Sequence, residues 1–267
     1  MRYLIFLISI LFPFFLAAEC GYKVEHDIPY STNTDKYSKE LCKLDIYYPE
    51  NVTDAPVVVW FHGGGLTDGE KFIPEQLMNS NLIVVAPNYR LLPNVEIEEC
   101  IDDAAASVAW TFKNISKFNG SNKKIFVAGH SAGGYLTSMI GLDKHWLEKY
   151  KIDADSLAGL IPYSGQAITH FAHRKRHGIG ELQPCVDSLA PLFHIRHDAP
   201  PYIIITGDRE HELYGRYEEN AYLWRMMKLV GHKDTYIYEL DGYNHGDMAV
   251  PAHHILKQHL LKILNNE

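Results

Sequence analysis

Three short runs of consecutive apolar residues restrict most strongly the folds open to this chain. The runs VVVWF, LIVVA and YIIIT show no alternation of polar and apolar residues. Strands of this kind occur where helices cover both faces of a parallel sheet. The same reasoning along the chain predicts strands at Leu44–Tyr48, Val57–Phe61, Leu82–Ala86, Lys124–Ala128, Leu157–Pro162, Tyr202–Thr206 and Thr235–Leu240.

Helical patterns alternate with these strands. Apolar residues recur every three or four positions from Ile97 to Ile115, after Asn94, which is suited to an N-cap. Further helices are predicted at Ala132–Leu142, Gly215–Val230 and Ala252–Leu264. The alternation predicts an α/β fold in which a mostly parallel central sheet carries helices on both faces. With 267 residues, of which 46% are hydrophobic, we expect one domain with a large core.

The N-terminal stretch has the composition of a secretory signal. Arg2 precedes an apolar segment from Leu4 to Leu16, and the small residues Ala17 and Ala18 follow it. The segment is short for a membrane span. We therefore expect a signal peptide over residues 1–18, a secreted or periplasmic domain over residues 19–267, and no stable membrane span. A retained anchor or lipidation of Cys20 is an alternative, although Glu19 stands where lipidation favours a small residue.

Four cysteines remain beyond this segment, at Cys20, Cys42, Cys100 and Cys185. Four cysteines allow three pairings, and the sequence does not choose among them. A Cys20–Cys42 disulfide is the most local option, and buried free thiols are the other interpretation. The spacings do not resemble those of a zinc site.

The charge of the chain bears on its partners. The net charge is -8, and lysines and arginines do not gather in a long run. Nucleic-acid binding requires a concentrated basic surface, so we expect a small or uncharged partner and no nucleic acid.

A serine between glycines follows one predicted strand directly. The segment Gly129-His130-Ser131-Ala132-Gly133 has the pattern GxSxG, with a strand before it and a helix after it. In this context the pattern indicates a nucleophile elbow, which exposes the serine hydroxyl at the end of the sheet. The sequence therefore marks Ser131 as a candidate nucleophile.

The segment His62-Gly63-Gly64-Gly65 follows another predicted strand. Adjacent glycines allow main-chain N–H groups to approach a ligand closely. An oxyanion hole needs such donors, one from a loop of this kind and one from the residue after the serine. A phosphate-binding loop is the alternative, but no GK[ST] follows the glycines.

A serine nucleophile needs a general base and an acid that orients it. His245 follows the last predicted strand and precedes the final helix, which is the position expected of the base. The acid should lie between serine and histidine in the chain, after another strand, and the run PYIIITGDREHE supplies carboxylates there. An ordinary imidazole titrates near pH 6.5, so we expect activity to fall in acid.

Together, HGGG, NYRLLP, GHSAGG, TGDRE and GYNHG resemble the motifs of the α/β-hydrolase superfamily. Within it the chain resembles the hormone-sensitive-lipase-like and bacterial feruloyl-esterase-like esterases, over nearly all of Leu44 to Leu264. The resemblance implies hydrolysis of carboxylic esters through an acyl-serine intermediate, without a cofactor or metal. It matches Ser131 to the nucleophile and His245 to the base. It also implies that Gly64, Gly65 and Ala132 donate to the oxyanion, and that Glu210, or alternatively Asp208, is the acid.

The segment of about 165–200 is longer than a simple crossover requires, and we expect it to form a small cap. Within it, HFAHRKRH places His170, His173 and His177 at helical spacing, with three cations between them. We interpret this segment chiefly as a solvated basic face. A metal site, or a contact with an anionic or sugar-bearing substrate, is an alternative.

These features favour a secreted serine esterase that acts on a short-chain or carbohydrate-linked ester. A peptidase or amide hydrolase with the same residues is one alternative, and a catalytically silent binding protein is another. The acyl group, the alcohol and the oligomeric state do not follow from the sequence.

Overall fold

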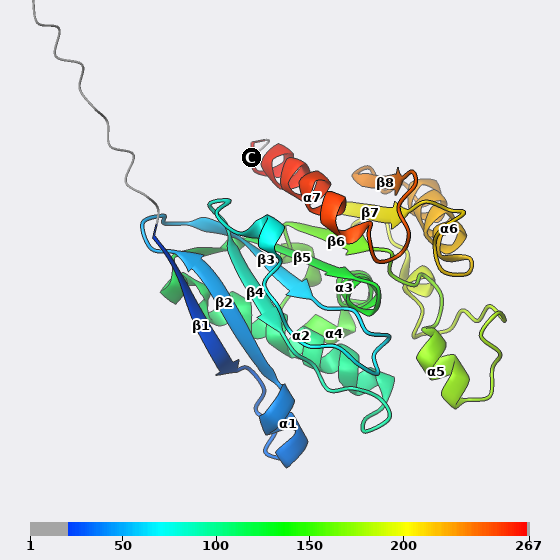
Figure 1. Cartoon of the computed structure of the whole chain (residues 1–267), viewed down its shortest axis with the longest axis horizontal. Helices are drawn as coiled ribbons and strands as arrows, with labels where there is room; N and C mark the ends of the chain where they lie inside the picture. The colour runs from blue at the N-terminus through cyan, green and yellow to red at the C-terminus, as the bar shows by residue number, and fades with distance from the viewer. Residues whose placement is uncertain (1–20, 266–267) are drawn as a thin grey trace, which may run out of the picture.

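The computed structural model describes residues 21–265, which form an eight-stranded sheet with helices on both faces (Figure 1). The strand order is β1-β2-β4-β3-β5-β6-β7-β8, and β3 to β8 run parallel to one another, whereas β1 and β2 pair antiparallel. The strands are β1 (Tyr22–Pro29), β2 (Lys43–Pro49), β3 (Ala55–Phe61), β4 (Ile83–Pro87), β5 (Gly120–His130), β6 (Gly159–Tyr163), β7 (Tyr202–Gly207) and β8 (Thr235–Leu240). The predicted mostly parallel sheet is confirmed.

Strand β1 was not predicted, although every other strand was. Its sequence YKVEHDIP is mostly polar, and most of its side chains are exposed. β1 lies at the edge of the sheet and pairs only with β2. Charged residues protect such edges from pairing with other chains. An edge strand without a buried face gives no apolar signal in the sequence.

The helices are α1 (Lys36–Leu41), α2 (Ile97–Asn114), α3 (Ala132–Leu142), α4 (His145–Glu148), α5 (Phe171–Arg176), α6 (Arg216–Leu229) and α7 (Ala249–Leu264). Short 3-10 turns lie at η1 (Glu75–Leu77), η2 (Ile115–Phe118), η3 (Ala154–Ser156) and η4 (Pro191–His194). The four predicted helices correspond to α2, α3, α6 and α7. The N-cap of α2 is Glu96, not Asn94, because Glu96 and Glu99 form a reciprocal capping box.

The central strand β3 shows how the two layers of the core are filled. Val57, Val59 and Phe61 pack in the cluster that contains residues of α2, α3 and α6. Val58 and Trp60 point to the opposite face and pack in the cluster that contains residues of α7. Successive side chains of a strand point to opposite faces, so a run without polar residues fills both layers. This double burial explains the apolar runs.

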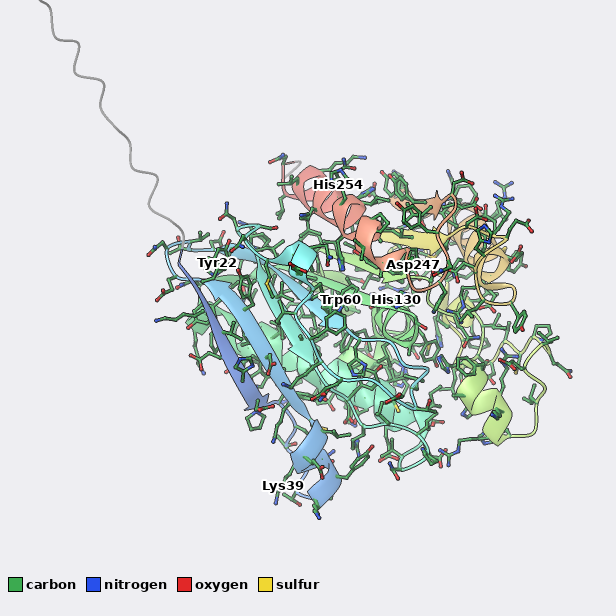
Figure 2. The ribbon with its side chains drawn as sticks, in the orientation of Figure 1. Tyr22, Lys39, Trp60, His130, Asp247 and His254 are labelled. Atoms are coloured by element: carbon green, nitrogen blue, oxygen red, sulfur yellow. The ribbon has the colours of Figure 1, made fainter. Side chains whose placement is uncertain are left out.

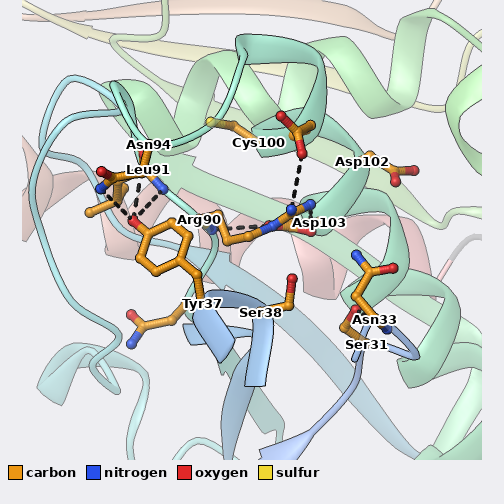
Figure 3. Close-up of polar contacts among 12 residues, drawn as sticks. Ser31, Asn33, Tyr37, Ser38, Arg90, Leu91, Asn94, Cys100, Asp102 and Asp103 are labelled. Atoms are coloured by element: carbon orange, nitrogen blue, oxygen red, sulfur yellow. Dashed lines mark hydrogen bonds and ion pairs between the residues drawn. The ribbon is translucent and has the colours of Figure 1, made fainter. Parts of the chain in front are cut away.

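A buried ion pair joins the loop after β4 to helix α2 (Figure 3). Asp103 accepts hydrogen bonds from Arg90 Nε at 2.7 Å, Nη2 at 2.9 Å and the backbone N–H at 3.0 Å. These bonds to Asp103 raise the pKa of Arg90. Glu99 accepts a further bond from Arg90 Nη1, and its side chain is 46% exposed. The pair fixes the loop that leads toward Leu92.

We expect Asp103→Ala to lower the free energy of unfolding by about 3–5 kcal/mol, because it leaves the buried guanidinium without its buried counter-ion and with only the exposed Glu99. Glu99→Gln is the matched control, since it removes the exposed charge and keeps the capping box, and it should cost less than about 1 kcal/mol. Urea unfolding of the variants measures both values. Equal losses would contradict a dominant role for the buried pair.

The predicted signal peptide of residues 1–18 and Cys20 lie outside the described residues. Cys42 and Cys100 are buried free thiols, and Cys185 is a partly buried one. Gly21 O accepts a hydrogen bond from Glu50 N–H at one end of the paired strands β1 and β2. Cys42 lies at the other end of this pair, where its carbonyl oxygen accepts from Tyr30 N–H. Among residues 21–265, no helix has both the length and the apolarity needed to cross a membrane.

Candidate active site

Ser131 lies in the turn between β5 and α3. Its φ of 56° and ψ of -114° place it in a conformation that side chains rarely adopt. The turn is fixed by two bonds, from Ser131 N–H to Tyr163 O at 2.8 Å and from Tyr135 N–H to Ser131 O at 3.0 Å. The strained position is that of a nucleophile elbow.

The glycines on either side allow this turn to lie close to β3. A Cβ on Gly133 would lie 2.1 Å from Phe61 O, and one on Gly129 would lie 2.6 Å from the Gly133 carbonyl carbon. Neither position accepts a side chain without moving backbone. The GxSxG spacing therefore follows from close packing as well as from the serine.

His245 reaches the serine from the segment between β8 and α7. Its Nε2 lies 2.9 Å from Ser131 Oγ, which is hydrogen-bonding distance. The His245 side chain is 18% exposed. Ser131 and His245, which are 114 positions apart, thus meet as the sequence predicted.

The carboxylate that meets His245 is that of Glu212. Its Oε2 lies 2.8 Å from His245 Nδ1, and only 1% of its side chain is exposed. Its Oε1 accepts hydrogen bonds from the Ser164 hydroxyl and from Gly207 N–H. Hydrogen bonds therefore fix both carboxylate oxygens of Glu212, and Oε2 faces the imidazole of His245.

The surroundings of Glu212 keep it ionised. Burial alone would raise the pKa of this carboxyl group. The hydrogen bond and charge of His245, with the bonds from Ser164 and Gly207, outweigh burial and lower the pKa to about 2. A carboxylate in this state accepts the Nδ1–H of His245 and fixes the tautomer in which Nε2 is free to take a proton.

The predictions of Glu210 and Asp208 as the acid are corrected by this geometry. Glu210 is exposed, and its carboxylate has no hydrogen bond or ion pair within the described residues. Asp208 accepts hydrogen bonds from Glu210 N–H at 2.8 Å and Gly242 N–H at 2.7 Å, which lower its pKa. Asp208 thus organises the turn and ties it to the segment after β8.

The error came from the length of the turn after β7. The N–H groups of His211 and Glu212 both donate to Asp208 O, at 2.9 Å, so the chain folds back after Glu210. This fold returns Glu212 to the end of the sheet. The run GDREHE contains three acidic residues, and Asp208 at its start is suited to a side-chain-capped turn. An Asp-capped turn at Asp208 favours Glu212, which follows the turn, as the acid over Asp208 and Glu210, which lie within it.

The segment of residues 62–65, called the glycine loop below, lies beside Ser131. A Cβ on Gly63 would lie 3.3 Å from Ser131 Cβ, whereas one on Gly65 would lie 3.0 Å from Phe171 Cζ. Gly63 is therefore the glycine of this loop that lies against Ser131, although it was not one of the predicted donors. Within the described residues the N–H groups of Gly64 and Gly65 donate no hydrogen bond. Ala132 begins α3, so its N–H has no partner inside the helix.

The side chain of His62 fixes the position of the glycine loop through a hydrogen bond and a ring contact. Its ring stacks on Tyr89 with centroids 4.4 Å apart, and its Nδ1 lies 2.7 Å from Gly63 O. Tyr89 donates its hydroxyl to His62 O at 2.9 Å. Burial lowers the pKa of His62 to about 4, so the ring is neutral at neutral pH. The first residue of HGGG thus orients the loop.

His130, the residue before the serine, is labelled in Figure 2 and contacts His245. Its Nε2 donates to His245 O over 2.7 Å, and the two rings lie 4.8 Å apart. Burial, with the neighbouring His245, lowers the pKa of His130 to about 4. A neutral His130 therefore joins the elbow to the segment that carries His245.

The basic segment of residues 170–177 is only partly a solvated face. His170 and Arg174 are buried, and Arg174 donates to the carbonyl oxygens of Thr169, Gly180, Glu181 and Gln183. The rings of His173 and His177 lie 4.1 Å apart. Among residues 21–265, no three His, Cys, Asp or Glu side chains are grouped as a metal site.

The sheet order, with Ser131 after β5 and His245 after β8, defines the α/β-hydrolase fold. Solved structures share it, including two esterases. A truncated carbohydrate esterase from gut microbiota aligns with a TM-score of 0.76 and 16% identity, over 92% of this chain and 98% of its own. An esterase from Thermogutta terrifontis aligns with a TM-score of 0.68 and 21% identity, over 92% of this chain and 93% of its own.

The sequence comparisons point to esterases of this fold. The BD-FAE family model matches residues 44–160. A probable isoprenylcysteine alpha-carbonyl methylesterase from Arabidopsis thaliana is 30% identical over 77% of this chain and 48% of its own length. A carboxylesterase from Mycobacterium tuberculosis is 35% identical over 36% of this chain and 32% of its own. The chain spans about half or less of these curated relatives, and the resemblance predicted from the motifs is confirmed.

Proposed function

We propose that this chain is a serine hydrolase of carboxylic esters, with Ser131, His245 and Glu212 as its catalytic residues. The observation that carries the proposal is the series of two contacts from Ser131 Oγ to His245 Nε2, at 2.9 Å, and from His245 Nδ1 to Glu212 Oε2, at 2.8 Å. This is the arrangement that activates a serine hydroxyl for acyl transfer. The similarity to esterases supports ester hydrolysis as the reaction.

In the first half of the reaction, Ser131 Oγ attacks the ester carbonyl carbon while His245 Nε2 takes the hydroxyl proton. Glu212 stabilises the resulting imidazolium from Nδ1. The N–H of Ala132 and one N–H of the glycine loop, which we assign to Gly64 with Gly65 as the alternative, donate to the oxyanion. The intermediate collapses, the imidazolium protonates the departing alcohol, and the acyl group stays on Ser131.

In the second half, water attacks the acyl-serine. His245 takes the water proton and returns it to Ser131 Oγ as the acid leaves, so the residues regain their starting state. Both halves need a neutral His245, because only the neutral imidazole has a lone pair for the proton. Glu212, whose pKa is lowered to about 2, keeps its charge above that pH.

Hydrolysis of p-nitrophenyl butyrate tests the proposal, and the matching p-nitroanilide distinguishes it from an amide hydrolase. We expect release of nitrophenol from the ester at a rate far above that from the anilide. A panel of acetylated and feruloylated sugars then tests the carbohydrate-linked class. Binding of these esters without turnover would instead support a catalytically silent protein.

His130 is expected to position the base. His130→Leu removes the bond to His245 O and should lower kcat by about 10- to 100-fold, a typical cost of a small displacement in an active site. His130→Gln keeps a donor near the Nε2 position and should recover most of this loss. Steady-state kinetics with both variants measure the effect. A glutamine variant as slow as the leucine variant would contradict this positioning role.

A further inference from the structure

A cavity of about 450 Å³ lies beside the glycine loop, between helix α5 of the cap and the loop that carries Leu92 and Pro93. Figure 1 shows α5 outside the sheet, apart from the helices that cover its faces. The cavity is lined by Thr67, Leu92, Pro93, Phe171, Ala172, Lys175 and Arg176. Its lining combines apolar side chains with the cationic Lys175 and Arg176.

The cavity adjoins the candidate active site through the glycine loop. Phe171 Cζ lies 3.0 Å from the position of a Cβ on Gly65, and the next glycine but one, Gly63, lies against Ser131. Leu92 N–H donates to Leu66 O at 2.8 Å, which joins the opposite wall to the same loop. The cavity and Ser131 are therefore joined through one short loop, with Gly65 at the cavity lining and Gly63 at the serine.

Helix α5 contributes both an aromatic ring and a cation to the cavity lining. Phe171 and Lys175 are four residues apart, so they lie on one face of the helix, about 6 Å apart along its axis. Phe171 is the lining residue that lies against the glycine loop. A chain that binds along this face of α5 can therefore contact the Phe171 ring and the Lys175 ammonium together.

Of the three cations on α5, only Lys175 has a side chain without a hydrogen-bond or ion-pair partner within the described residues. Arg174 is buried among carbonyl oxygens. Arg176 donates to Val95 O and Glu96 Oε1, both at 2.8 Å, and thereby clamps α5 to the opposite wall. Lys175 is exposed, and its ammonium has no hydrogen bond or ion pair among residues 21–265. Its charge is free to bind a ligand.

We propose that this cavity binds an apolar chain of the ester substrate that ends in an anionic group, and that Lys175 binds this group. The inference rests on the proposed esterase function for its chemistry. An apolar chain replaces water along Leu92 and Phe171, and the anion pairs with an ammonium that has no other partner. The chain can belong to the acyl part or to the alcohol part of the ester, and the test has an arm for each.

The test compares esters that differ only in a terminal carboxylate. For the acyl part, the pair is mono-p-nitrophenyl adipate and p-nitrophenyl hexanoate. For the alcohol part, the pair is 6-acetoxyhexanoate and hexyl acetate. A six-carbon chain is chosen because it spans about the rise from Phe171 to Lys175. The quantity measured is the ratio of kcat/KM for the anionic ester to that for the neutral ester.

In one of the two arms we expect this ratio to fall about fivefold in Lys175→Ala, the loss expected for one partly screened ion pair, and farther in Lys175→Glu. High salt should reduce the ratio of the wild-type protein. Lys233→Ala is the matched control, because Lys233 is an exposed, unpaired lysine before β8, at the other end of the strands. This control should keep the wild-type ratio.

A ratio that Lys175→Ala leaves unchanged in both arms would overturn the inference, and hydrolysis of the neutral esters would show that the proposed function still holds. If the wild-type protein hydrolyses no ester, the proposed function fails, and binding decides the inference. For that case, calorimetry compares monoethyl adipate and ethyl hexanoate on Ser131→Ala, with and without Lys175→Ala. Preference for the adipate that depends on Lys175 supports the inference, and equal affinities overturn it.

Discussion

Replacement of Glu212 by glutamine is expected to lower kcat by about 10⁴-fold, because a neutral amide no longer fixes the tautomer of His245 or stabilises its charged form. The side chain keeps its size, and Gly207 N–H and Ser164 keep an acceptor. The loss should therefore fall on kcat rather than KM. Steady-state hydrolysis of p-nitrophenyl butyrate measures it.

Glu210→Gln is the matched control for this prediction. It makes the same chemical change two residues earlier, on an exposed side chain, and should leave kcat within about twofold of the wild-type value, as surface substitutions away from a site usually do. A control as slow as Glu212→Gln, or a Glu212→Gln protein with normal kcat, would contradict the assignment of the acid.

Glu212 should also affect stability in a pH-dependent way. Its pKa in the folded protein is about 2, below that of an unfolded glutamate, so its charged form is the one that folding favours. The stability that Glu212 contributes is therefore present above about pH 4.3 and is lost as the pH falls toward the folded value. Unfolding of wild-type protein and Glu212→Gln should differ most near neutral pH and converge in strong acid.

Ser131→Ala is expected to reduce kcat by about a millionfold, since it removes the attacking oxygen. Alanine keeps the Cβ of serine, so the strained backbone at φ 56° is unchanged and the loss reports on the hydroxyl. The variant should fold with the circular dichroism and thermal midpoint of the wild-type protein. Single-turnover assays give the residual rate.

Ser116→Ala serves as the control for this loss. Ser116 is exposed, lies in η2, and its hydroxyl has no hydrogen bond within the described residues. We expect full activity from this variant. Residual activity of Ser131→Ala above about a hundredth of wild type would show that another group attacks the ester, because a lost nucleophile costs far more than this.

The sequence was sufficient for strands β2 to β8 and for two of the three residues that the structure brings together in the candidate active site. Doubly buried strands carry a strong apolar signal, and Ser131 and His245 stand at fixed places in the order of strands and helices. Glycines at 129 and 133 added a steric reason for the elbow. The apolar strands and the serine turn each depend on a short segment of the chain, so a local sequence pattern is enough to predict them.

The acid and strand β1 depended on information that such patterns lack. Glu212 reaches His245 because hydrogen bonds to Asp208 O turn the chain back, and three carboxylates in one run compete for the role. β1 is defined by pairing with β2 and buries little of its own surface. The position of β1 depends on a tertiary contact with β2, whereas that of Glu212 depends on how the local turn after β7 closes.

The attack by Ser131 on an ester carbonyl is tested most directly by covalent trapping. The protein is incubated with a fluorophosphonate, which reacts with activated serines, and its intact mass and tryptic peptides are measured. We predict one adduct per chain, on Ser131, with loss of esterase activity in proportion to labelling and no adduct in Ser131→Ala. Full activity with no adduct, or an adduct on another residue that accounts for the lost activity, would contradict the account.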